Sequence, residues 1–386
     1  MPSTPFDELQ RLASETGVEP ALDFLEHHFR RDKEYFKLFE VLKMRCRHRL
    51  NLPLVYSQQP DPLDEIQQRE LEDSLLGACR EIGILFFKSG QFQEGWMYLQ
   101  PIGDKELTEK LIQSIEPDEE NMDSLIEIAV SQGAAPTHGF QLLLKHYGTC
   151  NGITTFDTQA LRFDKPTQKQ MASTLLNHLY SELTENVRYA VESSGQGGDE
   201  LKQNVRLAEW LAMFPSITEG GAHHVDTTHL ASVMRIARIV DEPNDLQRAT
   251  ELAEYGKRLD KDFQYPGNPP FENTYPDHAF YYDALIGKEI DAAIEHFEEK
   301  VRSLDAHEIG PVAQETLVDL LVRIHRNEDA LTIVTEQLLG KFESLGIAPQ
   351  PFEIANTPEL RNRLKDYYLS QEDLLGFAVS ILDNRD

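Results

Sequence analysis

Residues 78–100, with the sequence ACREIGILFFKSGQFQEGWMYLQ, decide the fold class of this chain. Two apolar stretches with helical spacing flank a short turn that contains glycine. Two helices joined by so short a turn run antiparallel and pack against each other. Gly83 and Gly95 would let the helices approach closely, and Phe86, Phe92 and Leu99 would fill the space around them. The stretch therefore predicts a helical hairpin.

The same pattern recurs along most of the chain. Apolar residues repeat at helical spacing, strand-like alternation is nearly absent, and short polar turns separate pairs of helices. We expect an all-α protein with one helical-repeat domain over residues 1–386, built from stacked antiparallel hairpins with long polar loops. It would form an α-solenoid or a curled α–α superhelix. The predicted sub-regions are N-terminal repeats (1–117), an atypical helical part with a histidine-rich loop (118–240) and C-terminal repeats (241–386).

Breaks in the pattern are expected at three polar stretches, residues 56–65, 193–200 and 263–278, which are rich in proline, glycine and acidic side chains. In the middle region, a helix is expected to start after Pro136 and to stop at Gly148. Residues 150–157, CNGITTFD, are then expected to form a polar turn.

The hairpin at 78–100 resembles a tetratricopeptide repeat, a helix-turn-helix unit of about 34 residues that stacks into a superhelix. Weaker echoes extend the resemblance over about half of the chain. They lie at GVEPALDFLEHHF (17–29), RIARIVDEPNDLQRATELAEY (235–255), FYYDALIGKEIDAAIEHF (280–297) and LVDLLVRIHRNEDALTIV (317–334). The matching alanines, Ala249, Ala293 and Ala330, are 44 and then 37 residues apart, so the loops exceed those of a regular array. The resemblance implies a scaffold with a helical groove that binds a protein segment.

Charge and cysteine content limit the classes of partner. The chain has 37 Lys and Arg against 66 Asp and Glu, a formal net charge of −29. Such a surface repels nucleic acid and anionic lipid, so we expect neither a nucleic-acid nor a membrane partner. The first residues lack the basic and apolar parts of a secretory signal, and the three cysteines form no CxxC pair. These features predict a cytoplasmic protein.

Residues 219–234, EGGAHHVDTTHLASVM, combine three histidines with an aspartate at an expected helix start. Asp226 is placed to cap a helix that begins at Thr227, with His229 at the edge of its buried face. His223 and His224 lie in the extended stretch before it. Neutral imidazoles with a carboxylate are ligands that suit Zn, Mn or Fe. The alternative is a capped helix whose histidines are structural.

A second polar stretch, FENTYPDHAFYYD (271–283), places Asp277 and His278 just before another expected helix. If the helix starts converge on one face, His278 can complete the metal site. The predicted metal ligands are then His223, His224, His229 and His278. Asp226 and Glu272 would be the catalytic side chains, which orient ligands or move protons. The alternative here is again an N-terminal cap with aromatic packing.

Two hypotheses about function follow. The first is a metal-dependent enzyme, a hydrolase, lyase or oxygenase, that acts on a small molecule bound at a divalent metal. The alternative is a tetratricopeptide-like interaction scaffold without catalysis, which binds a protein segment. The sequence has no phosphate loop, dinucleotide fingerprint or GxSxG motif, so it does not match the common nucleotide enzymes and serine hydrolases.

Overall fold

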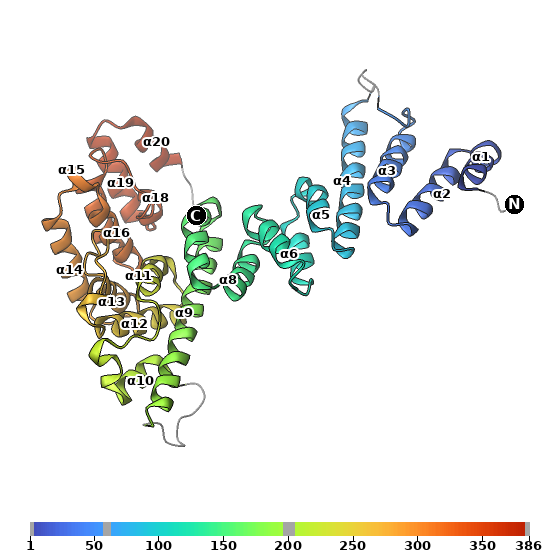
Figure 1. The fold of residues 1–386 in the computed structure, drawn as a ribbon. Coiled ribbons are helices and arrows are strands. Elements are labelled where there is room, and N and C mark those ends of the chain that lie inside the picture. Colours follow the sequence, from blue (N-terminus) through green and yellow to red (C-terminus); the bar gives the residue numbers. More distant parts are fainter. Residues whose placement is uncertain (1–3, 57–62, 196–204, 383–386) are drawn as a thin grey trace. The chain divides into compact units, whose positions relative to one another are not determined.

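The computed structural model describes residues 4–56, 63–195 and 205–382, and these residues form helices joined by turns (Figure 1). Within the described residues there is no β-strand, and an isolated bridge joins Pro266 and Asn273. The prediction of an all-α protein is confirmed. In the same part of the chain, no helix has both the length and the apolar character needed to cross a lipid bilayer.

The chain divides into two compact units, Met1–His146 and Tyr147–Asp386. The division falls inside the predicted middle region and inside helix α8 (Pro136–Gln159). Gly148 interrupts this helix with φ of 77° and ψ of −176°, a backbone conformation open mainly to glycine. The helix thus breaks where the sequence predicted.

The polar turn predicted at residues 150–157 is wrong, because this segment is helical. Thr154 and Thr158 donate their hydroxyl hydrogens to carbonyls one turn back, at distances of 3.1 and 2.8 Å, so the polar side chains are satisfied within the helix. The breaks predicted at 56–65 and 193–200 fall largely on 57–62 and 196–204, outside the described residues.

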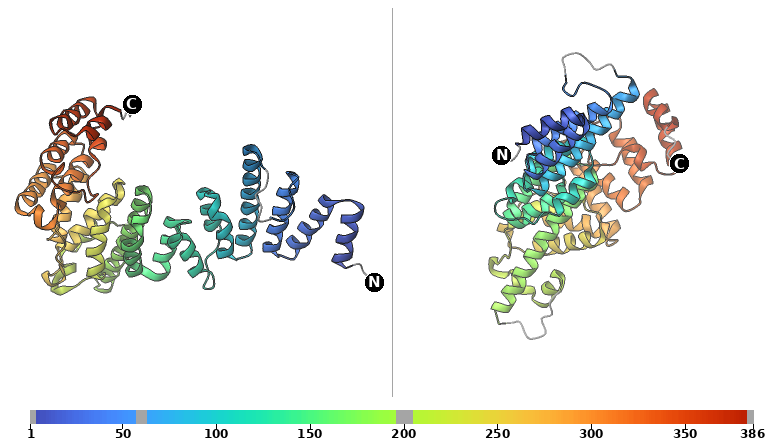
Figure 2. Two further views of the ribbon diagram at one scale, coloured as in Figure 1. Left: turned by 90° about the horizontal axis from the view of Figure 1, so that it is seen from above. Right: turned by 90° about the vertical axis from the view of Figure 1, so that its right-hand side faces the viewer.

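In the first unit, each helix from α1 to α5 packs against the next one along the chain. Figures 1 and 2 show α1 to α5 as a row of neighbouring helices. The helices of this unit before α8 are α1 (Pro5–Glu15), α2 (Val18–Arg31), α3 (Tyr35–Arg49), α4 (Glu65–Lys88), α5 (Phe92–Leu99), α6 (Lys105–Gln113) and α7 (Met122–Ile126). A π-helical turn, Glu127–Ser131, follows α7.

The hairpin predicted from residues 78–100 consists of α4 and α5. A Cβ on Gly83 would lie 2.6 Å from Cγ of Leu99 and 3.1 Å from the carbonyl oxygen of Gly95. A Cβ on Gly95 would lie 2.4 Å from the ring of Phe87 and 3.0 Å from the carbonyl oxygen of Gly83. The two glycines therefore face each other where the helices cross, as the sequence predicted.

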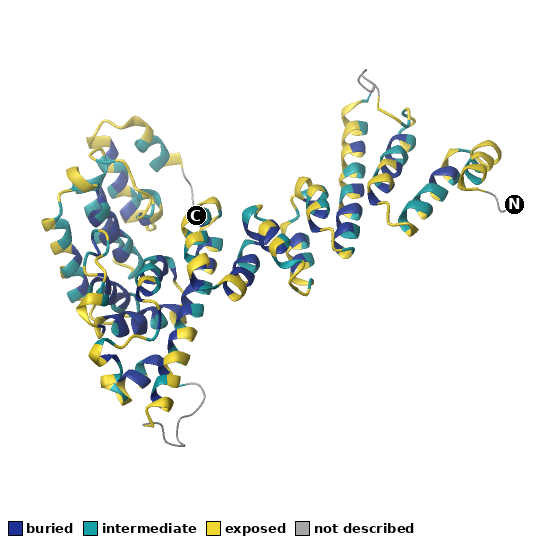
Figure 3. Cartoon of the chain, viewed as in Figure 1, coloured by how far each residue is buried: buried dark blue, intermediate teal, exposed yellow. Residues whose placement is uncertain are grey.

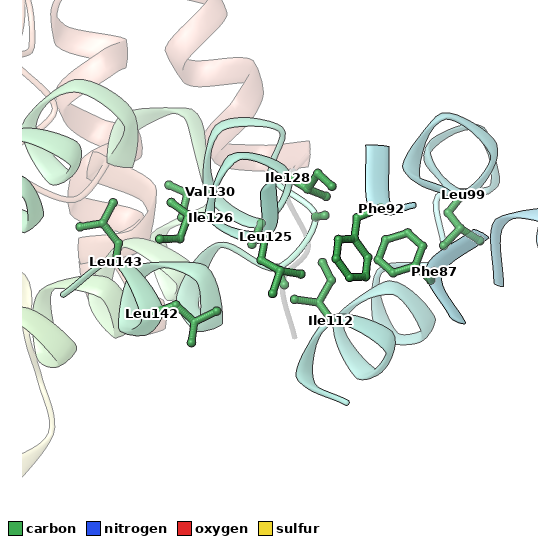
Figure 4. Packing of buried hydrophobic residues seen from close by; sticks show 13 residues of the cluster. Phe87, Phe92, Leu99, Ile112, Leu125, Ile126, Ile128, Val130, Leu142 and Leu143 are labelled. Carbon is green, nitrogen blue, oxygen red and sulfur yellow. The ribbon is translucent and has the colours of Figure 1, made fainter. Parts of the chain in front are cut away.

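A hydrophobic core joins this hairpin to the later helices of the first unit (Figure 4). Phe87 and Phe92 pack with ring centroids 5.8 Å apart, next to Ile112 of α6. Leu125 of α7 and Leu143 of α8 belong to the same cluster. Full burial of a side chain of this size stabilises a fold by about 1.5–3 kcal/mol, so this cluster holds the later helices of the unit together.

In the second unit, the long helix α9 (Lys165–Ser193) packs against α10, α11 and α12. Buried residues lie on the sides of the helices that face their neighbours (Figure 3). The other helices are α10 (Leu207–Met213), α11 (Thr227–Ile236), α12 (Pro243–Lys257), α13 (Thr274–Leu285), α14 (Ile290–Ser303), α15 (Ala306–Ile309), α16 (Val312–Arg323), α17 (Asn327–Ile333), α18 (Pro351–Ile354), α19 (Pro358–Ser370) and α20 (Leu374–Leu382).

Two charged side chains of α16 fix backbone outside their own helix. Arg323 donates from Nη1 to the carbonyl of Arg238 (2.5 Å) and from Nη2 to the carbonyl of Val240, at the end of the turn after α11. The buried carboxylate of Glu315 accepts hydrogen bonds from the backbone N–H groups of Leu345 (2.6 Å), Ile347 (2.9 Å) and Ala348 (3.3 Å). Both side chains satisfy backbone groups that no helix pairs.

Candidate functional site

Asp226 caps α11, and the prediction that the helix begins at Thr227 is confirmed. Its Oδ1 atom accepts hydrogen bonds from the backbone N–H groups of Thr228 (2.8 Å) and His229 (3.3 Å). The hydroxyl of Thr228 also donates to Oδ1, at 2.6 Å, and this bond is the main reason why the pKa of Asp226 lies below its usual value. The carboxylate is thus engaged with the first turn of the helix.

The three histidines of residues 219–229 lie in different surroundings. His223 is exposed, with Nδ1 3.2 Å from the carbonyl oxygen of Gly221 and its ring against Phe263. His224 is half-buried, and both its backbone nitrogen and Nδ1 lie 2.9 Å from the hydroxyl oxygen of Tyr255. Burial lowers the pKa of His224, so the ring is neutral at neutral pH. His229 is half-buried in the first turn of α11.

His278 is enclosed in the interior of the second unit. Its Nδ1 donates to the carbonyl oxygen of Thr274 (2.5 Å), and its ring stacks on Phe271 with centroids 4.4 Å apart. Burial, followed by the positive charge of Arg238, lowers the pKa of His278 to about 3. Its Nε2 atom is buried and has no hydrogen-bond partner. The neutral ring therefore holds an unused lone pair in the core.

Asp277 and His278 lie inside the first turns of α13, which begins at Thr274, and not just before the helix as the sequence suggested. The alternative prediction, an N-terminal cap, agrees with the structure in part. Asp277 accepts a hydrogen bond from the backbone N–H of Asn273 at 2.8 Å. Asn273 is the residue that precedes the helix.

Side chains of α14 hold Glu272 and Asp277, and we call the four residues Glu272, Asp277, His296 and Lys300 the Asp277 cluster. Lys300 Nζ lies 2.7 Å from Glu272 and 3.1 Å from Asp277, and His296 Nε2 lies 2.9 Å from Asp277. Burial raises the pKa of Asp277, but the hydrogen bonds from His296 and Lys300 outweigh it and lower the pKa below its usual value. The cluster ties the start of α13 to α14.

The predicted metal ligands are not gathered at one point. Over residues 4–56, 63–195 and 205–382, the structure contains no group of three or more His, Cys, Asp and Glu side chains arranged to hold a metal ion. Asp226 meets the backbone of His229, and Glu272 meets Lys300, so both predicted catalytic carboxylates contact groups of the protein itself. The Zn, Mn or Fe site stays a prediction.

A pocket of about 330 Å³ lies in the first unit, between the ends of α4 and α6 and the start of α5. The residues that line it are Phe87, Lys88, Gly90, Phe92, Leu111, Ser114 and Ile115. Lys88 is exposed and is the one ionisable residue of this lining. The lining thus combines four large apolar residues with one exposed lysine.

Sequence reasoning missed this pocket and also the residues that engage the predicted site, Tyr255, His296 and Lys300. Two signals could have indicated them. Leu111 and Ile115 repeat at an interval of four beyond the hairpin, and His296 and Lys300 share one face of α14 by the same spacing. Neither spacing indicates which distant segment of the chain these side chains contact.

Comparison with known proteins identifies no relative. No protein family matches the chain, and no curated protein or solved structure is significantly similar to it. The resemblance to tetratricopeptide repeats stays a prediction.

Proposed function

We propose that this protein is a helical interaction scaffold whose first unit binds a segment of another protein. The pocket between α4, α5 and α6 is the observation that carries the proposal. Its occupant would be one apolar side chain of the segment, with a neighbouring carboxylate paired to Lys88.

The size and composition of the pocket support a side chain as its occupant. Its volume of about 330 Å³ is at the small end of ligand pockets, which span roughly 300–1,000 Å³. Phe87, Phe92, Leu111 and Ile115 provide an apolar wall. With Lys88 as its one ionisable group, the lining offers no pair of acid and base for catalysis. An apolar anchor beside a charged rim is the usual arrangement of a peptide-binding site.

The test is a selection of random peptides displayed on phage, with the full chain as bait. We expect the enriched peptides to share an apolar residue next to Asp or Glu. Ser114→Phe places a ring at the mouth of the pocket and should weaken their binding at least about tenfold, because the anchor loses its space. Ser114 is exposed, so this change leaves the core intact.

The matched control is Gln113→Phe, which adds the same ring to the neighbouring exposed residue outside the pocket lining. It should leave binding unchanged. Lys88→Glu should weaken the binding of the acidic peptides a few-fold, as expected for the loss of one exposed ion pair. Peptides that bind the Ser114→Phe variant as tightly as the wild type would contradict the proposal.

A metal-dependent enzyme is the second candidate, and the buried Nε2 lone pair of His278 favours it. An unprotonated imidazole is the form that binds a metal. Mass spectrometry of the untagged protein, reconstituted separately with Zn, Mn and Fe, tests this candidate. Near-stoichiometric metal that is lost in a His224→Gln/His229→Gln variant would support it, and no bound metal in any preparation would exclude it.

A further inference from the structure

Helix α20 presents an apolar surface that the described part of the second unit does not cover. Its nine residues, LLGFAVSIL, contain no ionisable side chain, and none of them is buried. Figure 3 shows α20 in the colours of intermediate and exposed residues. A helix with this composition is normally covered on both sides.

The inner side of α20 packs on α19. Gly376 lies against the ring of Tyr368, so close that a Cβ on the glycine would lie 2.3 Å from a ring carbon. Tyr368 in turn shares the buried side of α19 with Leu360 and Leu364. The α19–α20 pair is therefore anchored through one side, which leaves the opposite side of α20 to solvent.

Five large apolar side chains at the end of α19 and on α20 are exposed, with exposed fractions from 50 to 79%, and we call these five residues the leucine face. They are Leu369, at the end of α19, and Leu374, Leu375, Ile381 and Leu382 of α20. Leu374 and Ile381 are seven residues apart, as are Leu375 and Leu382, so each pair repeats on the same side of the helix. Exposed apolar side chains that recur on one side of a helix are typical of an interaction site on a protein surface.

We propose that the leucine face pairs with the same face of a second copy of this chain, in a weak dimer with two-fold symmetry. A two-fold contact places one surface against itself, and because α20 has no ionisable side chain, no like charges of this helix meet there. The chain has a net charge of −29, so copies repel each other over most of their surface. The contact through α20 keeps like charges out of the interface.

The area of the leucine face fits a weak dimer. Its side chains together expose the equivalent of about three and a half complete side chains. Taking roughly 60–120 Å² for each, two copies would bury about 400–800 Å² of apolar surface. Stable interfaces bury about 1,200–2,000 Å² in total, so we expect dissociation in the micromolar range or above.

Sedimentation velocity of the full chain, from about 1 µM to about 200 µM, tests this inference, because so small an interface dissociates within that range. We expect the fraction of dimer to rise with protein concentration. It should also rise with added NaCl, because salt screens the repulsion between two acidic copies. A chain that stays monomeric throughout would overturn the proposal, as would a dimer that NaCl dissociates.

Charge substitutions locate the contact. Leu375→Glu/Leu382→Glu alters two exposed side chains without loss of buried packing and should weaken dimerisation at least tenfold. Leu161→Glu is the matched control, since Leu161 is 82% exposed and lies outside the leucine face, and it should leave the dimer intact. Circular dichroism checks that both variants keep their helices. A dimer that survives the double substitution would overturn the proposal.

Mixing distinguishes a second copy from an unrelated partner. Leu375→Lys/Leu382→Lys should be monomeric alone, like the glutamate variant. A mixture of the two variants should form a heterodimer, because opposite charges now meet across the two-fold axis. A mixture that stays monomeric would overturn the pairing of the two faces.

Discussion

Asp226 is expected to act on the stability of α11, because its carboxylate accepts the hydrogen bonds of Thr228 and His229. Asp226→Ala should lower the free energy of unfolding by about 0.5–2 kcal/mol, the usual cost of a lost N-cap. Asp226→Ser keeps an acceptor oxygen and should retain most of the stability. Thermal melts of the purified variants measure both changes.

The same melts test the predicted metal site when they are repeated with a chelator. If residues 219–229 only start a helix, the chelator changes neither the wild type nor the variants. If His224 and His229 bind a metal, the chelator lowers the melting temperature of the wild type, and His229→Gln abolishes that effect.

His278 should make the protein sensitive to mild acid. In the unfolded chain its pKa is near 6.5, whereas burial lowers it to about 3 in the folded state. Below about pH 6.5, His278 therefore binds a proton in the unfolded state but not in the folded state. The free energy of unfolding falls as the pH drops below this value. The loss approaches about 2 kcal/mol between pH 6.5 and pH 5. Urea unfolding at a series of pH values measures it.

His278→Leu is the comparison for this pH dependence, since leucine cannot bind a proton. Its unfolding free energy should fall less than that of the wild type over the same pH range. Asp277 does not obscure the result, because its lowered pKa causes loss of stability only as the pH falls through the region below 3.8. If the unfolding free energies of the two proteins depended equally on pH, His278 would not be buried in its neutral form.

Local patterns could predict some of these residues and not others. An aspartate followed by apolar residues at helical spacing is enough to predict an N-cap at Asp226. The hydrogen bonds of an N-cap reach only two or three residues along the chain. Tyr255 and Lys300 meet their partners from 31 and 28 residues away, at His224 and Glu272. The sequence gives the chemistry of such side chains, but the packing of helices decides which of them meet.

The α4–α5 hairpin depends on the absence of a side chain at Gly83. Gly83→Ala should cost about 1–3 kcal/mol, because the new methyl group would overlap Leu99 at 2.6 Å. Gly77→Ala in the same helix is the control. A Cβ there would meet nothing within 4 Å, so the change should stabilise the protein by about 0.5–1 kcal/mol. Chemical unfolding measures the stability of both variants. Equal changes in their unfolding free energies would contradict the close approach of α4 and α5.

Among the helices, this hairpin was also the part that the sequence predicted best. Two glycines and a three-residue turn leave little choice of geometry, so residues 78–100 determine their own packing. Residues 150–157 misled the prediction because threonine, asparagine and glycine favour turns in isolation. In the folded chain, the threonine hydroxyls bond to helical carbonyls, and the segment continues the helix.

The division into two compact units predicts independent responses to core substitutions. Ile112 is 1% exposed in the core of the first unit, and Leu317 is 2% exposed in α16 of the second. Each change to alanine should cost about 2–5 kcal/mol. Hydrogen exchange followed by mass spectrometry should speed up in residues 4–146 for Ile112→Ala and in residues 147–382 for Leu317→Ala. Faster exchange in both units from one substitution would contradict this expectation.

The Glu315 carboxylate should also control how proteases cut the protein. Its two oxygens hold three N–H groups of residues 345–348, just after the exposed Lys341. Glu315→Gln replaces one oxygen with an amide that faces another donor, so the segment loses part of its anchor. A protease needs a length of released backbone around the bond that it cleaves. Trypsin should therefore cleave the glutamine variant after Lys341 well before it cleaves the wild type. The single buried carboxylate of Glu315 would then determine whether proteases can cut the segment between α17 and α18.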